Sequence, residues 1–282
     1  MSVQCDRQSV RGKLAGPRAF TLIEVLVVVA IIALLVSILL PSLKQARYQA
    51  RVVACQGRLH DLGNAFQMYS NVYNGYFPLT MGSTEDNFSC LWRAKMLPST
   101  EILICPATRN VVRGETLEFA KHDDTESQSD LYYVASGPED SNGGHSYEYN
   151  GCYNSDKGFS MSRAPKKSTT FIYPPHEMML VHDADNERTD QPDPAFGCRP
   201  IAMNDSREGG NNCPQAWDNH GQAGMNMMFG DGHARFTKKT TGKVLDMREA
   251  RDGTLPDPKP SVNAEIETIW LKSQFPWRYR RR

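Results

Sequence analysis

A long apolar segment near the amino terminus constrains this chain more than any other feature. Residues 22–40 contain only two polar side chains, Glu24 and Ser37. A helix of about 20 apolar residues can cross the roughly 30 Å hydrocarbon core of a bilayer. Because a carboxylate is costly in hydrocarbon unless it is neutralised or paired, Glu24 requires a partner outside its own helix. We therefore predict a membrane-spanning helix whose first turn contacts another chain.

The charge distribution predicts the orientation of this helix. The 32 basic and 32 acidic residues of the 282-residue chain cancel, so no global basic field indicates nucleic-acid binding. Residues 1–19, however, hold four basic residues and one acidic residue, which favours a cytoplasmic location for that end. A secretory signal peptide is the alternative, but its apolar centre is shorter, about 7 to 15 residues, and its small-residue cleavage site follows that centre. Here Ala19 precedes the apolar run, so we expect a retained membrane helix.

The residues around Ala19 carry a family resemblance. The sequence from Ala19 to Glu24, Ala-Phe-Thr-Leu-Ile-Glu, resembles the processing site of type IV prepilins and type II secretion pseudopilins. In that family a small residue precedes the cut, an N-methylated aromatic residue begins the mature chain and a glutamate follows four residues later. Pro41 resembles the proline of the family's first helix, whereas Ala19 stands where glycine is usual. The resemblance covers about residues 11–73 and implies cleavage between Ala19 and Phe20 by a prepilin peptidase, with Phe20, Glu24 and Pro41 serving assembly.

The pattern changes after Pro41 from solidly apolar to amphipathic. Apolar residues recur every three or four positions from Leu43 to Tyr69, until Asn74-Gly75 and Pro78 provide turn signals. We expect one helix from residue 21 to about 72, kinked near Pro41. We expect a basic leader at residues 1–19 that is removed on processing, and a transmembrane and assembly helix at 20–40. Its amphipathic continuation is expected at 41–73, and a β-rich globular domain with a basic tail at 74–282.

The globular domain shows short apolar or aromatic runs separated by turn residues. Such runs favour strands, and the expected fold is α+β and pilin-like, with the long helix packed on a small antiparallel sheet that has long loops. Two short helices are also expected, over 92–97 and from residue 266 to 270. The expected strands cover 131–135, 145–149, 169–173, 178–182, 224–229 and 233–237.

The cysteines suggest an oxidising compartment. Cys5 lies in the expected leader, which leaves six cysteines in the mature chain, an even number that favours disulfides in an exported domain. Short intervening loops favour Cys90 with Cys105 and Cys198 with Cys213. Buried free thiols and a metal cluster remain alternatives, although the absence of a Cys-x-x-Cys spacing argues against a zinc knuckle.

A second motif lies near residue 220. Two strand-like runs flank Asp231-Gly232, which predicts a hairpin with a type I′ turn. The passage resembles a carboxy-terminal signature of many prepilin-like proteins, in which nine residues separate a histidine from Asp-Gly; here ten separate His220 from Asp231. One hypothesis is a metal or catalytic site formed by His220, Asp231 and His233, with residues 182, 183 and 185 as further members. The alternative is a turn with hydrogen-bonded polar residues and no site.

A calcium site is the other metal hypothesis. Asp183, Asp185, Asn186 and Glu187 place oxygen ligands within five positions, and Asp-rich loops stabilise the globular domain of some major pseudopilins. A solvated acidic loop is the alternative. Apart from possible calcium, the sequence predicts no cofactor.

Catalytic motifs are lacking: the sequence has no nucleophile elbow, phosphate-binding loop or dinucleotide fingerprint. The resemblance instead implies a non-enzymatic structural subunit of a pseudopilus or pilus-like filament. Expected partners are the prepilin peptidase, other pilin-like subunits, an assembly platform and secretin, and membrane lipid, with no evident nucleic acid. The expected location is the inner membrane, single-pass, with the carboxy-terminal domain in the periplasm or on the surface. A membrane-anchored surface-binding module for polysaccharide, exported substrate or DNA is the alternative, followed by an anchored metal-dependent hydrolase.

Overall fold

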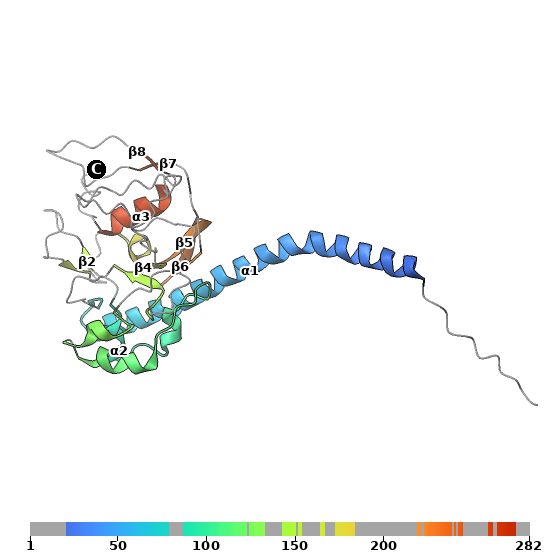
Figure 1. The fold of residues 1–282 in the computed structure, drawn as a ribbon. Coiled ribbons are helices and arrows are strands. Elements are labelled where there is room, and N and C mark those ends of the chain that lie inside the picture. The colour runs from blue at the N-terminus through green and yellow to red at the C-terminus, as the bar shows by residue number, and fades with distance from the viewer. Residues whose placement is uncertain are drawn as a thin grey trace, which may run out of the picture. The chain divides into compact units, whose positions relative to one another are not determined.

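The fold is seen in a computed structural model of the chain (Figure 1). It divides into two compact units, Met1–Arg47 and Tyr48–Arg282. The residues that the structure describes are 21–78, 87–122, 124–132, 143–150, 152–153, 164–166, 173–183, 219–220, 223–238, 240, 242–244, 259–261 and 264–274.

Helix α1 spans Leu22–Val72, which confirms the expected long amino-terminal helix. Pro41 lies inside it and does not end it. Proline has no N–H to donate, so the carbonyl four residues earlier, that of Ser37, loses its helical partner. The hydroxyl groups of Ser37 and Ser42 donate to the carbonyl oxygens of Leu34 and Leu39, at 2.7 and 2.8 Å, so both side chains are satisfied within the helix.

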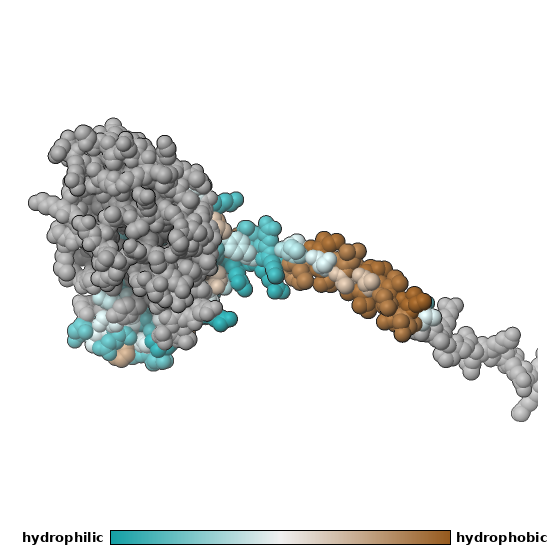
Figure 2. All heavy atoms as spheres, turned by 45° about the horizontal axis from the view of Figure 1, so that its top comes forward, coloured by the Kyte–Doolittle hydropathy of each residue, from teal (hydrophilic) through white to brown (hydrophobic). Residues whose placement is uncertain are grey.

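The first half of α1 is apolar and exposed. Its large hydrophobic side chains from Leu22 to Leu40 are between 44 and 78% exposed, and Figure 2 shows them as an almost continuous hydrophobic surface on the face in view. Within the described residues, α1 is the one helix long and apolar enough to cross a membrane. A helix that is hydrophobic on all sides is suited to lipid or to other helices rather than to water.

The second half of α1 is buried along one face. Cys55, Leu59, Leu62 and Phe66 are fully buried and recur at the three- and four-residue spacing that places side chains on one side of a helix. They belong to the larger hydrophobic core of the second unit. Phe66 packs among other aromatic rings: its ring lies 4.8 Å from that of Tyr149, centroid to centroid, and near two further phenylalanines.

A four-stranded antiparallel sheet accompanies this helical face. Its strands are β1 (Tyr147–Tyr149), β4 (Met179–Asp183), β5 (Gly224–Phe229) and β6 (Ala234–Lys238), in the order β1-β4-β5-β6. All three neighbouring pairs are antiparallel. The α+β layout of a long helix with a small antiparallel sheet is therefore confirmed.

The two faces of the sheet contact different helices. In β5, Met228 joins the core against α1, whereas Met225, Met227 and Phe229 join a second core with α3 (Ala264–Gln274). This alternation follows from the two-residue period of a strand. In β4, Met179 lies in the second core, whereas Leu180 and Val181 both lie in the first. A β-bulge between Met179 and Val181 changes the alternation at that point.

The remaining elements are short. Two small antiparallel pairs, β2 with β3 and β7 with β8, lie outside the main sheet. Their strands are β2 (Cys152–Tyr153), β3 (Ala164–Pro165), β7 (Gly242–Val244) and β8 (Lys259–Ser261). The described residues also form α2 (Ser89–Arg93) and the 3₁₀ helices η1 (Thr100–Leu103), η2 (Gly114–Lys121), η3 (Glu126–Gln128) and η4 (Pro175–Glu177).

Three expected elements differ from the structure over their described residues. The helix expected over 92–97 instead begins at Ser89 and ends at Arg93, and Lys95 after it has a positive φ of 55°, which a helix does not allow. Leu131 and Tyr132 lie in a turn and a bend, so the strand expected over 131–135 does not begin there; residues 133–135 lie outside the described chain. Tyr173 is also in a bend, and the rest of the strand expected over 169–173 is outside the described residues.

Candidate functional site

The first turn of α1 forms a reciprocal cap around Glu24. The Thr21 N–H and hydroxyl both donate to the Glu24 carboxylate at 2.8 Å, and the Glu24 N–H donates to the Thr21 hydroxyl oxygen at 3.3 Å. This is the capping box, in which the cap residue and the residue three positions later satisfy each other's backbone donors. Thr21 was not singled out from the sequence, although a threonine followed three positions later by glutamate indicates it. Ala19 and Phe20 lie outside the described residues.

The hairpin predicted around Asp231-Gly232 joins β5 to β6. The Gly232 N–H donates to the Phe229 carbonyl at 2.8 Å, and the Phe229 N–H donates to the His233 carbonyl at 3.0 Å. Of the three loop residues only Gly232 has a positive φ, 87°. The type I′ turn predicted from the sequence is therefore wrong: Gly230 extends the loop to three residues, with a bulge at Gly232.

Asp231 and His233 stabilise this turn from outside. One oxygen of Asp231 accepts from the His233 N–H at 3.2 Å and lies 2.6 Å from His233 Nδ1. Burial opposes ionisation of Asp231, but the hydrogen bonds from His233 outweigh it and lower the pKa of Asp231. The His233 ring also stacks on Phe229, with centroids 4.5 Å apart. These contacts assign both residues to the turn and not to a site with His220.

Gly232 lies directly against helix α1. A Cβ placed on Gly63 would be 2.7 Å from the Gly232 carbonyl oxygen, closer than real contacts allow. The Gln67 side chain, one turn further along, donates to the Gly230 carbonyl at 2.6 Å. The hairpin turn is thus packed on the backbone of α1, which Gly63 permits because it has no Cβ, while Gly232 supplies the positive φ of the turn.

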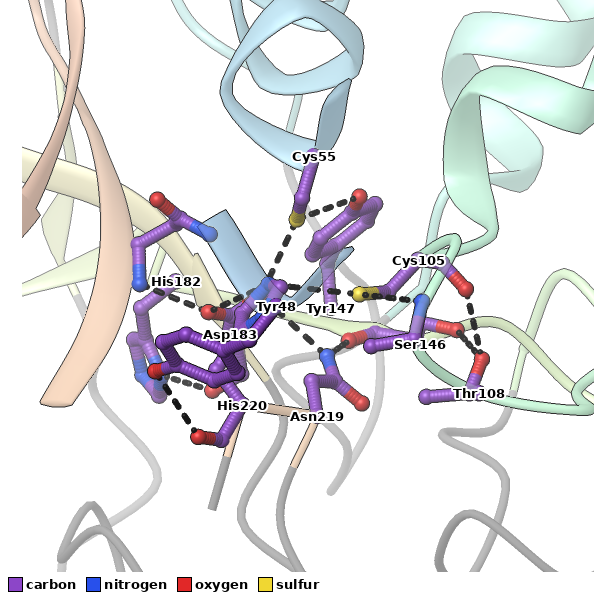
Figure 3. A network of polar contacts seen from close by, with 12 residues as sticks. Tyr48, Cys55, Cys105, Thr108, Ser146, Tyr147, His182, Asp183, Asn219 and His220 are labelled. Atoms are coloured by element: carbon purple, nitrogen blue, oxygen red, sulfur yellow. Dashed lines mark hydrogen bonds and ion pairs between the residues drawn. The ribbon is translucent and has the colours of Figure 1, made fainter. Parts of the chain in front are cut away.

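His220 belongs to a buried cluster with Cys55, Cys105 and Asp183 (Figure 3). The Cys55 sulfur lies 3.3 Å from Asp183 Oδ1, and the Cys105 sulfur lies 3.4 Å from His220 Nε2. His220 Nε2 is also 3.7 Å from Asp183 Oδ2. One ligand atom from each of the four residues lies within 4.8 Å of the other three.

Four separate segments supply these side chains. Cys55 is on the buried face of α1, and Asp183 is the last residue of β4 on the same side of the sheet as Val181. Cys105 follows η1, and the Arg58 guanidinium of α1 donates to the carbonyl of Ile104 just before it. The Tyr48 hydroxyl, also on α1, donates to the His220 carbonyl at 3.1 Å. Helix α1 therefore contacts each of the other three segments directly.

The surrounding groups are further hydrogen-bond partners for the cluster. The Asn226 N–H donates to Asp183 Oδ2 at 2.6 Å, and the Asn219 amide donates to Asp183 Oδ1 at 3.2 Å. The Tyr147 hydroxyl lies 3.1 Å from the Cys55 sulfur, and the Ala107 N–H donates to the Cys105 sulfur at 3.4 Å. Both sulfurs and both carboxylate oxygens are thus held in position.

This environment separates the two thiols in acidity. Burial raises the pKa of Cys55. Burial also opposes ionisation of Cys105, but its contacts with Cys55 and His220 outweigh burial and lower the pKa of Cys105 to about 7. Burial opposes protonation of His220, yet the negative charge of Asp183 raises the pKa of His220 overall. Cys105 is therefore the cysteine that ionises more readily.

The disulfide expected between Cys90 and Cys105 is not formed. Cys105 is a free thiol that faces His220, whereas the Cys90 sulfur accepts a hydrogen bond from Arg93 at 3.5 Å. The short loop between the two cysteines predicted their pairing, but α2 and η1 place them in different surroundings. Cys198 and Cys213 lie outside the described residues.

The structure does not bring together all the residues of the other metal hypotheses. Of the expected calcium ligands, Asp183 faces the cysteine cluster, and Asp185, Asn186 and Glu187 lie outside the described part of the chain. His182, next to Asp183, faces the opposite way and lies 3.4 Å from Glu148. Among the described members of the larger set of histidines and carboxylates, His220 and Asp183 meet in the buried cluster. Asp231 and His233 meet separately, in the hairpin turn. Cys55 and Cys105 were not expected beside them, because nothing in the spacing of these four residues indicates proximity.

Comparison with known proteins gives one match. Residues 16–40 match the family model described as the prokaryotic N-terminal methylation motif. No curated protein and no solved structure matches the chain. The motif together with the long apolar helix is consistent with a prepilin-like protein and supports a precursor of the type IV pilin or pseudopilin type.

Proposed function

We infer that this protein is a structural subunit of a type II secretion pseudopilus or type IV pilus-like filament. The observation that carries this proposal is the methylation motif at residues 16–40, placed at the start of a helix whose apolar half is exposed. In this function a prepilin peptidase cuts between Ala19 and Phe20 and methylates the new amino terminus. The helix then holds the subunit in the inner membrane until assembly.

The exposed apolar half supplies the energy that holds the subunit in the membrane. Burying one large aliphatic side chain contributes about 1.5–3 kcal/mol, and more than a dozen such side chains between Leu22 and Leu40 are exposed in the single chain. Lipid covers them before assembly, and neighbouring helices cover them in a filament, so assembly exchanges one apolar contact for another and is driven by van der Waals packing between helices. Packing against the same segment of other subunits therefore requires no rearrangement of the globular unit.

Glu24 gives the assembly its register. In the single chain its carboxylate accepts from Thr21, and in the filament it pairs with the amino group of Phe20 on a neighbouring subunit. The pair neutralises two charges that would otherwise be costly in an apolar core. The globular unit then lies in the periplasm or on the cell surface, beside the assembly platform and secretin that build the filament.

Mass spectrometry of the mature amino terminus tests processing. The full chain is produced with and without a co-expressed prepilin peptidase. A chain that begins with N-methyl-Phe20 only when the peptidase is present supports the proposal. An intact leader, or a cut after Leu40, contradicts it.

Replacement of Glu24 tests assembly separately. Glu24→Ala is expected to be processed and inserted normally but to be lost from sheared filaments. Glu101→Ala, an exposed glutamate of η1, is the matched control and should assemble like the parent chain. Equal incorporation of both variants would exclude the proposed pairing.

A further inference from the structure

We propose that Cys55, Cys105, Asp183 and His220 bind one zinc ion in a closed, structural site. This goes beyond the assembly role and does not depend on it: a protein without zinc could still be a filament subunit, and a zinc protein need not be one. The site lies entirely within the second unit of the chain.

The separations between the four side chains match tetrahedral zinc. Zinc binds sulfur at about 2.3 Å and nitrogen or oxygen at about 2.0–2.1 Å, so the edges of its tetrahedron measure roughly 3.3–3.8 Å. The sulfur–oxygen, sulfur–nitrogen and nitrogen–oxygen distances described above are 3.3, 3.4 and 3.7 Å, the first to Oδ1 and the last to Oδ2 of the Asp183 carboxylate. The remaining pairs lie within 4.8 Å. Small rotations of the side chains therefore suffice to centre an ion.

The donor set favours zinc over the hard cations. Two thiolates and one imidazole are soft or intermediate ligands, which calcium and magnesium avoid and zinc accepts. Binding forms two zinc–sulfur bonds and releases the two thiol protons to solvent. The two thiolates and the Asp183 carboxylate then carry three negative charges, of which the ion neutralises two, and His220 binds as a neutral imidazole.

Burial indicates a closed site. Cys55 and Cys105 are fully buried, and Asp183 and His220 are 1 and 5% exposed. Four protein ligands fill the tetrahedral coordination that structural zinc sites use, whereas catalytic sites keep a position for water. The arrangement is therefore suited to holding segments together and not to hydrolysis.

The neighbouring donors fit the second coordination sphere of such an ion. Groups around a metal orient its ligands and tune their basicity. Here the Asn219 amide and the Asn226 N–H fix the Asp183 carboxylate, and the Ala107 N–H points at the Cys105 sulfur. With zinc bound, Tyr147 donates its hydroxyl hydrogen to the Cys55 thiolate, across the 3.1 Å that separates the two atoms. Each of these contacts is compatible with ionised sulfur.

The ion would connect parts of the chain that are far apart in sequence. Cys55 and His220 are separated by more than half the chain length, and the ion would fasten α1, the segment after η1, the end of β4 and the segment before β5. A zinc crosslink does this without oxidation, because zinc has no redox chemistry in proteins. It would also keep Cys55 and Cys105 from forming a disulfide during export.

Elemental analysis of the full chain tests the site. The protein is purified in detergent without a metal-affinity tag and in a phosphine reductant, and zinc and calcium are measured by inductively coupled plasma mass spectrometry. We expect about one zinc per chain, as one four-ligand site requires. Absence of zinc after incubation with a modest excess of zinc would overturn the proposal, as would calcium in its place.

Cobalt substitution reads the ligands without any mutation. Cobalt(II) in place of zinc should give visible d–d bands of a tetrahedral site and a near-ultraviolet thiolate charge-transfer band. Octahedral spectra, or spectra without the thiolate band, would overturn the proposal. A disulfide between Cys55 and Cys105 in the non-reduced protein, mapped by peptide mass spectrometry, would also overturn it.

Variants separate the four ligands from other residues. Cys105→Ser and His220→Ala should each lower zinc affinity by about tenfold or more. Cys90→Ser, at a described cysteine outside the cluster, and Glu187→Gln, at an expected calcium ligand, are the controls and should retain the ion. His220→Cys keeps a ligand at that position, so it should recover zinc and strengthen the thiolate band of the cobalt form. Equal zinc content in Cys105→Ser and Cys90→Ser would overturn the assignment.

Discussion

The two halves of helix α1 are continuous in backbone but opposite in how they use their side chains. The half from Leu22 to Leu40 is almost entirely apolar and exposed, whereas the half after Tyr48 buries one face in the globular core and leaves the other exposed. The second half finds its core within its own chain. None of the described residues buries the first half, which is suited to contact with lipid or with other helices. A helix can therefore belong to the fold at one end and to an assembly at the other.

The largest expected effect comes from truncating the buried face. Phe66→Ala removes a ring packed among Phe77, Phe88 and Tyr149 and should destabilise the globular unit by about 3–5 kcal/mol. Leu35→Ala, in the exposed half, should leave that stability unchanged while weakening assembly. Urea denaturation followed by near-ultraviolet circular dichroism in detergent measures the stability of both variants, and recovery of sheared filaments measures their assembly. Equal destabilisation would abolish the distinction between the halves.

The next effect compares two glycines of α1, Gly63 and Gly57, whose replacement by alanine should change stability in opposite directions. Gly63→Ala places a methyl group against the Gly232 carbonyl and should cost about 1–3 kcal/mol. Gly57→Ala meets nothing within 4 Å, so the higher helix propensity of alanine should stabilise the same helix by about 0.5–1 kcal/mol. Denaturation midpoints compare the two variants. A stabilising Gly63→Ala would show that the hairpin does not contact the helix there.

Acid should affect the second unit before the apolar half. The guanidinium of Arg113 donates twice to the Asp130 carboxylate, at 2.7 and 2.9 Å. Burial raises the pKa of Asp130, but these bonds outweigh it and lower that pKa overall. A carboxyl with a depressed folded pKa contributes stability above its unfolded pKa of about 3.9 and loses it as pH falls through the folded pKa.

The comparison with Asp130→Asn isolates this carboxylate. The parent globular unit should lose stability below about pH 4, and Asp130→Asn should be less stable at neutral pH and lose less on acidification. Helicity of the apolar half, which holds no titratable group after Glu24, should not change over this range. Denaturation and far-ultraviolet circular dichroism at several pH values provide the test. Parallel pH curves for parent and variant would contradict the role of the pair.

The smallest effect concerns the start of the helix. Thr21→Val removes the hydroxyl that bonds Glu24 and should increase hydrogen exchange of the first-turn amides, whereas Thr21→Ser keeps it. Because only the first turn is involved, the globular unit should keep its denaturation midpoint. Identical exchange in both variants would show that the cap does not order this end.

Local patterns predicted most of the fold, and long-range contacts were not predictable. The apolar run, the three- and four-residue spacing up to Tyr69 and the short apolar run of β5 each depend on neighbours along the chain, so residues alone indicate the long helix and the central strands. The buried cluster depends on the packing of four distant segments. His220 and Asp183 were candidates by type, but their partners Cys55 and Cys105 had no spacing that indicates them. The hairpin was predictable, but its loop length was not. The Asp-Gly pair indicates a two-residue turn, whereas the loop also includes Gly230.

The bulge in β4 carries a consequence for insertions and deletions. Because the strand period is two, the side of the sheet that a residue faces is a question of odd or even count from the bulge. At present the count places Asp183 toward Cys55 and His182 toward Glu148. Inserting one residue between Val181 and His182 would move His182 to the position that Asp183 now holds, on the side of the sulfurs, and would turn Asp183 to the other side. In this strand the number of residues matters as much as their identity.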